Sequence, residues 1–373
     1  MSDEATDAAY AVALASLPMM GPGRLRALLT RWPPRVAWRA VQRDTACDEP
    51  RVAVACGNEA AKVRALWTRA SARIDPGRAL ANATQQGIAV QLLGQPGYPA
   101  ELAADHEAPS VCFVLGDASK LASPVRVAVI GTRSATAPGL SMAKQLGHDL
   151  AEAGVAVVSG LARGIDGAAH LGALHANGAP PIGVVGSGLD VPYPKVNAGL
   201  WSAVATHGVL LSEAPPGAPP SAWRFPARNR MIAALADVVV VIESRVSGGS
   251  MLTVREAAAR GRQVMAVPGS VASPASEGTN QLIYDGCCPV RDALDVLIAL
   301  GLSTAERGRA GARRRPPTGD DGRLLALFDS GDSLDIETLV HSSGRALGEV
   351  ALALGRLEDA GFLERNGAWW RAT

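Results

Sequence analysis

The chain has 373 residues, of which 48% are hydrophobic and only 4% aromatic. This length predicts two or three domains, and this hydrophobic fraction excludes a disordered protein. The formal net charge of +1 gives no global indication of a nucleic acid, a membrane surface or an acidic substrate as partner.

Residues 8–80 have the pattern of a small helical domain. Apolar positions recur at helical spacing and are interrupted by Pro18 and by the turn at residues 21–23, which predicts a helix, a hairpin and a second helix. Residues 1–80 hold 12 basic and 8 acidic residues, a balance of +4. The hairpin could contact a DNA backbone, or the module could serve as a helical cap or a dimer surface.

Six short apolar runs, separated by helical stretches, follow from about residue 125. They read VRVAVIG, VAVVSG, PIGVVGSG, GVLLSE, DVVVVIES and QVMAVPG. Valine-rich strands that alternate with helices are typical of a parallel sheet covered on both faces. The sequence therefore predicts an α/β fold with a Rossmann-type core over residues 81–303, whose functional residues lie on the loops after the strands.

The last part of the chain is predicted to be a separate domain. Residues 304–318 contain glycine, proline and five arginines but almost nothing apolar, which indicates a linker. Residues 319–373 then have the order helix, helix, longer helix and a short hairpin around Asn366 and Gly367. That order predicts a C-terminal winged-helix domain.

Composition also predicts where the protein works and what it lacks. No apolar run reaches the ~18 residues of a membrane span, and the acidic start is unlike a signal peptide. The five cysteines are odd in number and lack metal-ligand spacing. We therefore expect a cytoplasmic protein with no membrane partner, no metal and no cofactor.

The first two strand-end loops are suited to an anion. Gly131 permits close backbone approach, Arg133 supplies a forked donor, and Ser134 adds a hydroxyl before the next helix. The second strand ends in Ser159 and Gly160 instead of the acid that a dinucleotide site requires. A phosphate site without nicotinamide chemistry is predicted, and the absence of a Walker A sequence argues against nucleotide hydrolysis.

Asp166 and His170 are four residues apart and invite a catalytic interpretation. No nucleophile lies beside them in the sequence, and a lone histidine on an alanine-rich helix is more often structural. We therefore predict no catalytic residue.

The remaining loops add further donors for anions. Gly186 and Lys195 follow the third strand, and residues 223–230 (WRFPARNR) follow the fourth. Three arginines within seven residues, interleaved with Trp223 and Phe225, suit single-stranded nucleic acid, although the two rings could equally be core anchors with surface arginines around them. The fifth loop contributes Gly249 and Ser250. Residues 81–303 hold 14 basic and 16 acidic residues, so any basic groove must be local.

Seven segments together resemble the DprA/Smf family. They are VAVIGTRSAT, VSGLARGIDGAAH, GSGLDVPYPKVN, LLSEAPPG, FPARNRMIAAL, GRQVMAVPG and EGTNQLIYDG, in that order, and the resemblance covers roughly residues 88–290. The chain departs from the family pattern at two places outside these segments: Gly248 stands where a serine is usual, and Cys287 and Cys288, after the last segment, stand where a small alanine is common.

The resemblance implies a DNA-processing protein of natural transformation, and not an enzyme. It also implies a helical, SAM-like N-terminal domain, here residues 1–80, and a C-terminal winged helix. Such a protein binds and protects incoming single-stranded DNA, helps to load the recombinase RecA and acts as a homodimer. The residues expected to contact DNA are Gly131, Arg133, Ser134, Ser159, Gly160, Gly186, Lys195, Arg228, Asn229, Arg230, Gly249 and Ser250.

Two alternatives to this function remain open. A nucleotide-binding enzyme of the phosphoribohydrolase type would need an acid in the loop SGGSMLTVRE, where Glu256 is one residue out of register. A second alternative is an adaptor that holds a nucleotide signal at the sheet edge.

Residues 319–373 hold 10 acidic and 5 basic residues, so we expect the winged helix to contact protein and not DNA.

Overall fold

The computed structural model describes residues 3–122, 125–302, 317, 319–328, 333–359, 362–366 and 369–372. The chain divides into two compact units, Met1–Ala310 and Gly311–Thr373, which we describe separately. The predicted linker, residues 304–318, lies outside the described residues except for Pro317. No helix in the described ranges is long and apolar enough to cross a membrane.

The first unit begins with six α-helices, and four of them start with a proline. Proline is favoured at the first helical position because its fixed backbone angle suits a helix and its missing N–H would have no partner there. The helices are α1 (Asp3–Ala15), α2 (Pro22–Arg31), α3 (Pro34–Gln42), α4 (Pro50–Cys56), α5 (Ala60–Ser71) and α6 (Pro76–Gln85), with short 3₁₀ turns η1 (Ala46–Asp48) and η2 (Gly57–Glu59). The predicted helix, hairpin and helix are confirmed as α1 and α2.

The six predicted strands are confirmed and form the parallel part of one sheet. They are β3 (Arg126–Ile130), β4 (Ala156–Ser159), β5 (Ile182–Val185), β6 (Val209–Ser212), β7 (Val238–Val241) and β8 (Gln263–Ala266). The whole sheet has the order β1-β2-β6-β5-β4-β3-β7-β8-β9. The strands from β3 to β7 are buried at every position, as continuous apolar strands between two helix layers should be.

The sheet extends beyond the predicted strands at both edges. β1 (Ile88–Leu92) and β2 (Val111–Gly116) are antiparallel, with Leu92 opposite Val111. β2 also runs antiparallel to β6, with Phe113 opposite Ser212. β9 (Cys288–Pro289) adds a short parallel edge. Because β2 runs against β6, it begins at the edge where β6 ends.

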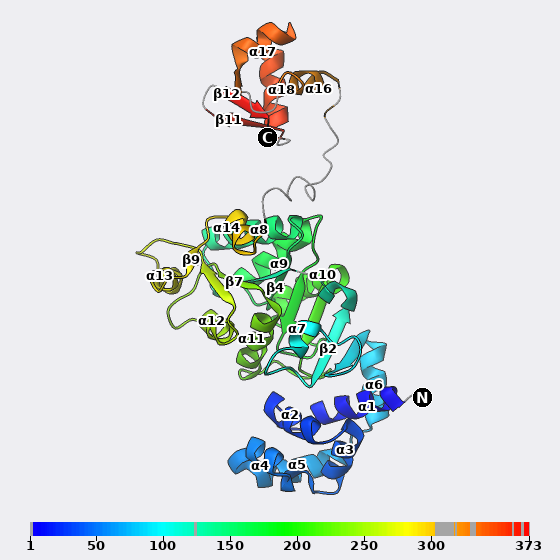
Figure 1. Ribbon diagram of the computed structural model, residues 1–373. Helices are drawn as coiled ribbons and strands as arrows, with labels where there is room; N and C mark the ends of the chain where they lie inside the picture. Colours follow the sequence, from blue (N-terminus) through cyan, green and yellow to red (C-terminus); the bar gives the residue numbers. More distant parts are fainter. Residues whose placement is uncertain are drawn as a thin grey trace. The chain divides into compact units, whose positions relative to one another are not determined.

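Helices cover both faces of the sheet (Figure 1). One face is packed by α8 (Ala137–Glu152), α9 (Ile165–His175), α10 (Ala198–His207) and α14 (Ala293–Ala299). The other is packed by α7 (Ala100–Ala103), α11 (Arg224–Leu235), α12 (Ser250–Ala259) and α13 (Glu277–Tyr284). Two 3₁₀ turns, η3 (Ala118–Ala122) and η4 (Lys195–Asn197), lie between these elements.

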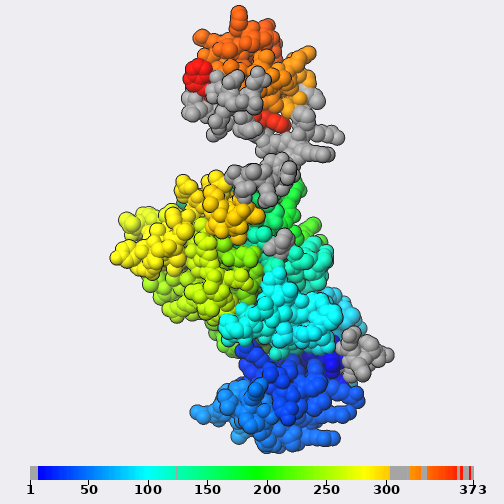
Figure 2. All heavy atoms as spheres, in the orientation of Figure 1, coloured from blue at the N-terminus to red at the C-terminus, as the bar shows by residue number. Residues whose placement is uncertain are grey.

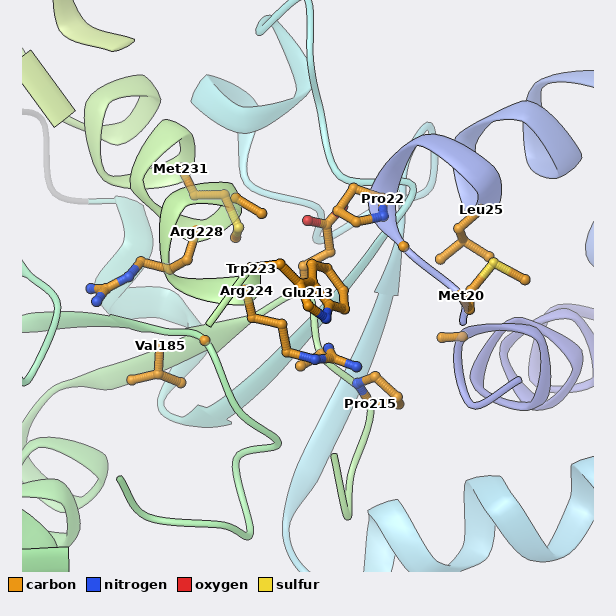
Figure 3. A pocket seen from close by; sticks show the side chains of 15 residues that line it. Met20, Pro22, Leu25, Val185, Glu213, Pro215, Trp223, Arg224, Arg228 and Met231 are labelled. Atoms are coloured by element: carbon orange, nitrogen blue, oxygen red, sulfur yellow. The ribbon is translucent and has the colours of Figure 1, made fainter. Parts of the chain in front are cut away.

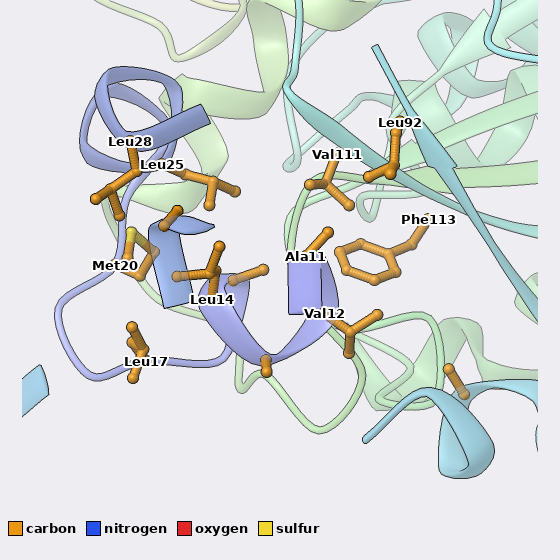
Figure 4. Packing of buried hydrophobic residues seen from close by; sticks show 14 of the residues in the cluster. Ala11, Val12, Leu14, Leu17, Met20, Leu25, Leu28, Leu92, Val111 and Phe113 are labelled. Atoms are coloured by element: carbon orange, nitrogen blue, oxygen red, sulfur yellow. The ribbon is translucent and has the colours of Figure 1, made fainter. Parts of the chain in front are cut away.

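The N-terminal helices share a hydrophobic core with the sheet. Ala11, Val12 and Leu14 of α1 belong to the same buried cluster as Val111 and Phe113 of β2 (Figure 4). In the space-filling view the blue N-terminal helices abut the cyan β1–β2 segment (Figure 2). The domain boundary predicted at residue 80 falls inside α6.

The second unit is small and has its own core. Its elements are α16 (Gly319–Leu325), β10 (Ser333–Asp335), α17 (Ile336–Ser343), α18 (Leu347–Asp359), β11 (Leu363–Asn366) and β12 (Trp369–Ala372). The strands form an antiparallel sheet of order β10-β12-β11, packed on a cluster that includes Leu339, Val350 and Trp370. Three helices followed by a hairpin match the predicted order, while β10 was not predicted and Gly367 lies outside the described residues.

Candidate nucleic-acid interface

The strand order creates a crevice at the carboxyl ends of β3 and β7. The chain leaves β3 toward β4 on one side and later returns to β7 on the other, which makes this point a topological switch. In open α/β sheets, ligands bind in the crevice at such a switch. The loop that begins at Gly131 and the loop that precedes α12 face each other across it.

Glu243, which follows β7, fastens the two loops together. Its backbone carbonyl accepts a hydrogen bond from the Thr132 N–H at 2.7 Å. Its carboxylate accepts from the Thr136 N–H at 2.9 Å and from the Thr136 hydroxyl at 2.5 Å. The side chain is buried, so this acid is structural. Sequence reasoning missed it, and its only signal was an acid at the end of a valine-rich run.

A pocket of about 540 Å³ lies at the switch point, and we call it the switch pocket. Six of the twelve residues predicted to contact DNA line it: Gly131, Arg133, Arg228, Asn229, Gly249 and Ser250. The α12 helix starts at Ser250, and the positive end of its helix dipole favours an anion there. Exposed Arg245 also lines the pocket and was not predicted.

A second pocket of about 200 Å³ adjoins the first, with Phe225 in the wall of both. The Arg133 guanidinium lies 5.1 Å from the centre of the Phe225 ring. The centres of the Tyr193 and Phe225 rings are 5.4 Å apart. Exposed Arg163 completes the lining with Val196. Aromatic rings beside free guanidinium groups can stack on bases and hold phosphates.

Arg228 lies in the floor between the two pockets. It is only 7% exposed, and its guanidinium donates to the carbonyl of Val184 at 2.8 Å. A Cβ added to Gly160 would come within 1.5 Å of that guanidinium, so only glycine fits beneath it. Burial lowers the pKa of Arg228 to about 10, against the opposing effect of Asp166. The side chain therefore carries its positive charge at neutral pH.

Asp166 and His170 are both buried beneath the switch pocket. Burial raises the pKa of the Asp166 carboxyl, although Arg228 opposes this, and the carboxyl accepts from the Gly160 N–H at 3.2 Å. Burial also lowers the pKa of His170 to about 4, so its ring is neutral near pH 7. Neither residue has a nucleophile within hydrogen-bond distance, and among the described residues no His, Cys, Asp and Glu cluster could hold a metal.

Arg230 points away from both pockets. It is 6% exposed and donates to both carboxylate oxygens of Glu213, at 2.8 and 2.9 Å. Burial raises the pKa of Glu213, and the charge of Arg230 opposes that rise. This pair connects α11 to the end of β6. The arginine that sequence reasoning placed on the DNA is thus committed to an internal ion pair.

The other predicted residues lie around the two pockets and not within the larger one. Ser159 is fully buried and donates to the carbonyl of Val129 at 2.6 Å, which closes its hydroxyl to a ligand. Gly160 lines the smaller of the two pockets. Ser134 and Lys195 are exposed at the rim. Gly186 faces a small space of about 30 Å³ between α2 and α11 (Figure 3).

The aromatic residues of α11 and its N-cap reach solvent. Trp223 is 47% exposed, with the Arg224 guanidinium 4.6 Å from its ring centre. Phe225 is half-buried. The alternative of core aromatics with surface arginines is therefore wrong, because Arg228 and Arg230 are buried and the rings are not.

Comparison with known proteins gives consistent matches. Residues 89–301 match the family described as DNA recombination-mediator protein A. The DNA processing protein DprA of Bacillus subtilis is 37% identical over 219 residues, which cover 59% of this chain and 73% of that protein.

Two solved structures also match. The crystal structure of DprA from Streptococcus pneumoniae superposes with a TM-score of 0.63 at 30% identity, over 78% of this chain and 95% of that chain. DNA processing protein A from Helicobacter pylori, described in terms of its single-stranded DNA binding mode, superposes with a TM-score of 0.52 at 29% identity. That match covers 57% of this chain and 95% of the other.

Proposed function

The chain belongs to the DNA recombination-mediator protein A family, and from this membership we propose that it binds single-stranded DNA at the switch point of its sheet. The observation that carries the proposal is Phe225, which lies in the wall of two pockets with Arg133 and Tyr193 against its ring. A base stacks on the ring while its phosphates meet the guanidinium groups.

The charge of the pockets supports a polyanion. Arg133, Arg163 and Arg245 are exposed around the two pockets, and the only acid among the lining residues is the buried Asp166. Residues 81–303 have a small excess of acids overall. The positive charge is therefore concentrated where the ligand would lie.

The predicted DNA contacts fall into three groups in this proposal. Residues that line the two pockets touch the strand directly, and Ser134 and Lys195 contact phosphates at the rim. Ser159, Gly186 and Arg230 act indirectly, by fixing the loops and α11. The physical reason is burial, because a guanidinium that already satisfies a buried carboxylate has no charge to offer a phosphate.

We extend the proposal to the cellular role that membership of the family implies. The protein protects incoming single-stranded DNA, promotes loading of RecA on it during natural transformation, and acts as a homodimer in the cytoplasm. It performs no catalysis and needs no cofactor.

We propose that residues 319–373 form a winged-helix domain that contacts protein. We propose that this domain follows a linker over residues 304–318. We place the boundary between the helical and Rossmann-type domains near residue 80. Two arginines of the C-terminal domain are paired internally, Arg356 with Asp321 at 2.6 Å and Arg345 with Glu349 at 3.9 Å. Its acidic balance leaves little to attract phosphates.

The enzyme alternative has less support. Glu256, the acid that a phosphoribohydrolase would use, accepts a hydrogen bond from the Arg260 guanidinium at 2.5 Å and does not line either pocket. The alternative of an adaptor that holds a nucleotide signal has more support than the enzyme alternative, because a pocket of about 540 Å³ can hold a mononucleotide.

Fluorescence anisotropy with labelled oligo-dT and a duplex of equal length, across a salt series, tests the proposal. We expect preference for the single strand, and a loss of about 1–3 kcal/mol of binding free energy in Phe225→Ala. Arg133→Gln should lower the affinity and flatten its salt dependence, whereas Arg69→Gln, an exposed arginine of α5, should change neither. No single-strand preference, or full affinity in both pocket variants, would contradict the proposal. Saturable binding of dTMP that competes with oligo-dT poorly would favour the nucleotide signal.

A further inference from the structure

The N-terminal helices reach the same sheet edge as the switch pocket. β2 begins beside the end of β6, so the β1–β2 connection lies at the edge that carries the strand-end loops. Pro22 and Leu25 of α2 line the small space beside Gly186 and Glu213 at that edge (Figure 3). From there α2 runs about 15 Å, by its ten residues, to Arg31.

A groove of about 340 Å³ lies where α2 ends, and we call it the Trp32 groove. Trp32 and Pro33 form one wall, and Leu93, which is 42% exposed, lies in the other with His106. Trp32 is half-buried and has the Arg31 guanidinium 5.6 Å from its ring centre. The groove thus offers an aromatic face to a flat ligand, while the Arg31 guanidinium beside it is paired with Glu49 at 3.2 Å.

The helix that follows the groove carries a row of arginines, which we call the α3 ridge. It consists of Arg35 and Arg39 of α3 and of Arg43, which directly follows the helix; the three are spaced four residues apart and therefore about 6 Å along the axis. Ala37, Trp38 and Val41 are buried on the opposite side of α3. All three arginines are exposed, and none has an ion pair or side-chain hydrogen bond with any described residue.

The nearest acids in the sequence do not neutralise the ridge. Asp44 lies 3.9 Å from Arg64 and accepts from the Thr68 hydroxyl at 3.0 Å. Glu49 accepts from Arg31 at 3.2 Å. The ridge therefore presents to solvent three arginines that have no ion pair with a described residue.

We propose that the Trp32 groove and the α3 ridge are a second contact for single-stranded DNA, which takes up the strand that leaves the switch pocket along the sheet edge. The inference rests on the proposed function and extends it. From β3 to β2 the sheet order has four strand spacings, about 19 Å, which a few nucleotides cover. One base stacks on Trp32, and successive phosphates meet the arginines of the ridge.

The choice of a single strand over a duplex follows from the groove. A half-buried tryptophan in a concave site can accept a splayed base but cannot reach a base within a stacked duplex. A ridge of arginines alone would suit either form, so the Trp32 ring decides between them.

The test compares two lengths of labelled oligo-dT, about 6 and about 30 nucleotides, because only the longer one can fill both contacts. We expect the triple variant Arg35→Gln, Arg39→Gln, Arg43→Gln to bind the long oligonucleotide about tenfold more weakly at low salt. Its salt slope should fall by about 2, the value for three lost phosphate contacts on a single strand. Its affinity for the short oligonucleotide should be unchanged.

The matched control removes three other exposed arginines of the helical part, Arg69→Gln, Arg73→Gln and Arg78→Gln, with the same loss of charge. Equal losses in the control and ridge variants, or equal losses for both lengths, would overturn the inference. So would a ridge variant that loses duplex binding only. Trp32→Leu, which keeps apolar volume, should weaken only the long oligonucleotide, and the single variant Arg39→Glu covers the case in which the triple variant unfolds. If wild-type protein binds neither length, the proposed function itself fails.

Discussion

The helices α3 and α11 use tryptophan and arginine in opposite ways. In α3, Trp38 is 2% exposed while Arg35 and Arg39 face solvent. At the start of α11, Trp223 is 47% exposed while Arg228 and Arg230 are buried. The difference teaches that residue type alone does not place a side chain, because an arginine can be buried wherever the fold supplies an acceptor for it.

The acceptors that permit this burial lie on other elements. Val184 of β5 accepts from Arg228, and Glu213 after β6 accepts from Arg230. No acceptor among the described residues reaches Arg35 or Arg39. The arginines of α11 therefore stabilise the scaffold beneath the site, and those of α3 remain available to a ligand.

The largest effect should come from breaking the buried ion pair. Arg230→Met leaves the Glu213 carboxylate buried without a partner, which should cost about 3–5 kcal/mol of unfolding free energy. Arg39→Met in α3 should change it by no more than about 0.5 kcal/mol. Urea denaturation measures both. The double variant Arg230→Met, Glu213→Leu should recover most of the loss, and failure to recover would show that the pair is not what stabilises α11.

The two tryptophans should respond in the opposite order. Trp38→Ala empties a buried position in the helical core and should cost about 3–5 kcal/mol of unfolding free energy. Trp223→Ala removes a half-exposed ring and should cost about 1 kcal/mol or less. Thermal unfolding of the two variants compares them directly. Similar melting temperatures would mean that Trp223 anchors the core after all.

The next largest loss of stability should come from adding a single methyl group beneath Arg228. Gly160→Ala places a Cβ where the guanidinium now lies, so the buried charge must move, at a cost of about 3 kcal/mol. It should also weaken oligo-dT binding, because Arg228 forms the floor of both pockets. Gly199→Ala is the control, since a Cβ there meets nothing within 4 Å. Unchanged stability and binding in Gly160→Ala would contradict the packing of Arg228.

Acid should destabilise the buried region by a smaller amount. His170 has a pKa of about 4 when folded and about 6.5 when unfolded, so the unfolded chain binds more protons between these values. Its contribution to stability is complete above pH 6.5 and decreases as the pH falls, by about 2 kcal/mol at pH 5. Urea midpoints at pH 7 and pH 5 should differ less in His170→Gln than in the wild type. An equal pH dependence in both proteins would contradict the assignment.

Much of the fold could be predicted because its signals are local. Valine-rich runs gave the six parallel strands, and prolines and glycines gave the ends of α1 and α2. The antiparallel strands β1 and β2 were not predicted, because their sequences, IAVQL and VCFVLG, carry no feature that assigns them to this sheet. Only pairing with β6 places them there.

The candidate site could be predicted as a set of loops but not as a set of contacts. Because ligands bind at the carboxyl ends of parallel strands, the sequence alone predicts that Gly131, Arg133 and Gly249 lie at one edge of the sheet. Arg163 was missed although it lies in the segment VSGLARGIDGAAH, where only Ser159 and Gly160 were taken as contacts, and Arg245 was missed because it lies outside the segments that carry the resemblance. Ser159 was included because its backbone position is right, although its hydroxyl is used within the sheet.

The sequence by itself determined the order of the six parallel strands and the helices between them, the resemblance to the family and the sheet edge at which we propose that a ligand binds. The tertiary structure decided which arginines are free. The physical reason is that periodicity and turn chemistry depend on neighbours in the chain, whereas the charge that a side chain can offer depends on acceptors far away in sequence. Glu213, seventeen residues before Arg230, pairs with that arginine in the interior, and no acid among the described residues pairs with an arginine of the α3 ridge.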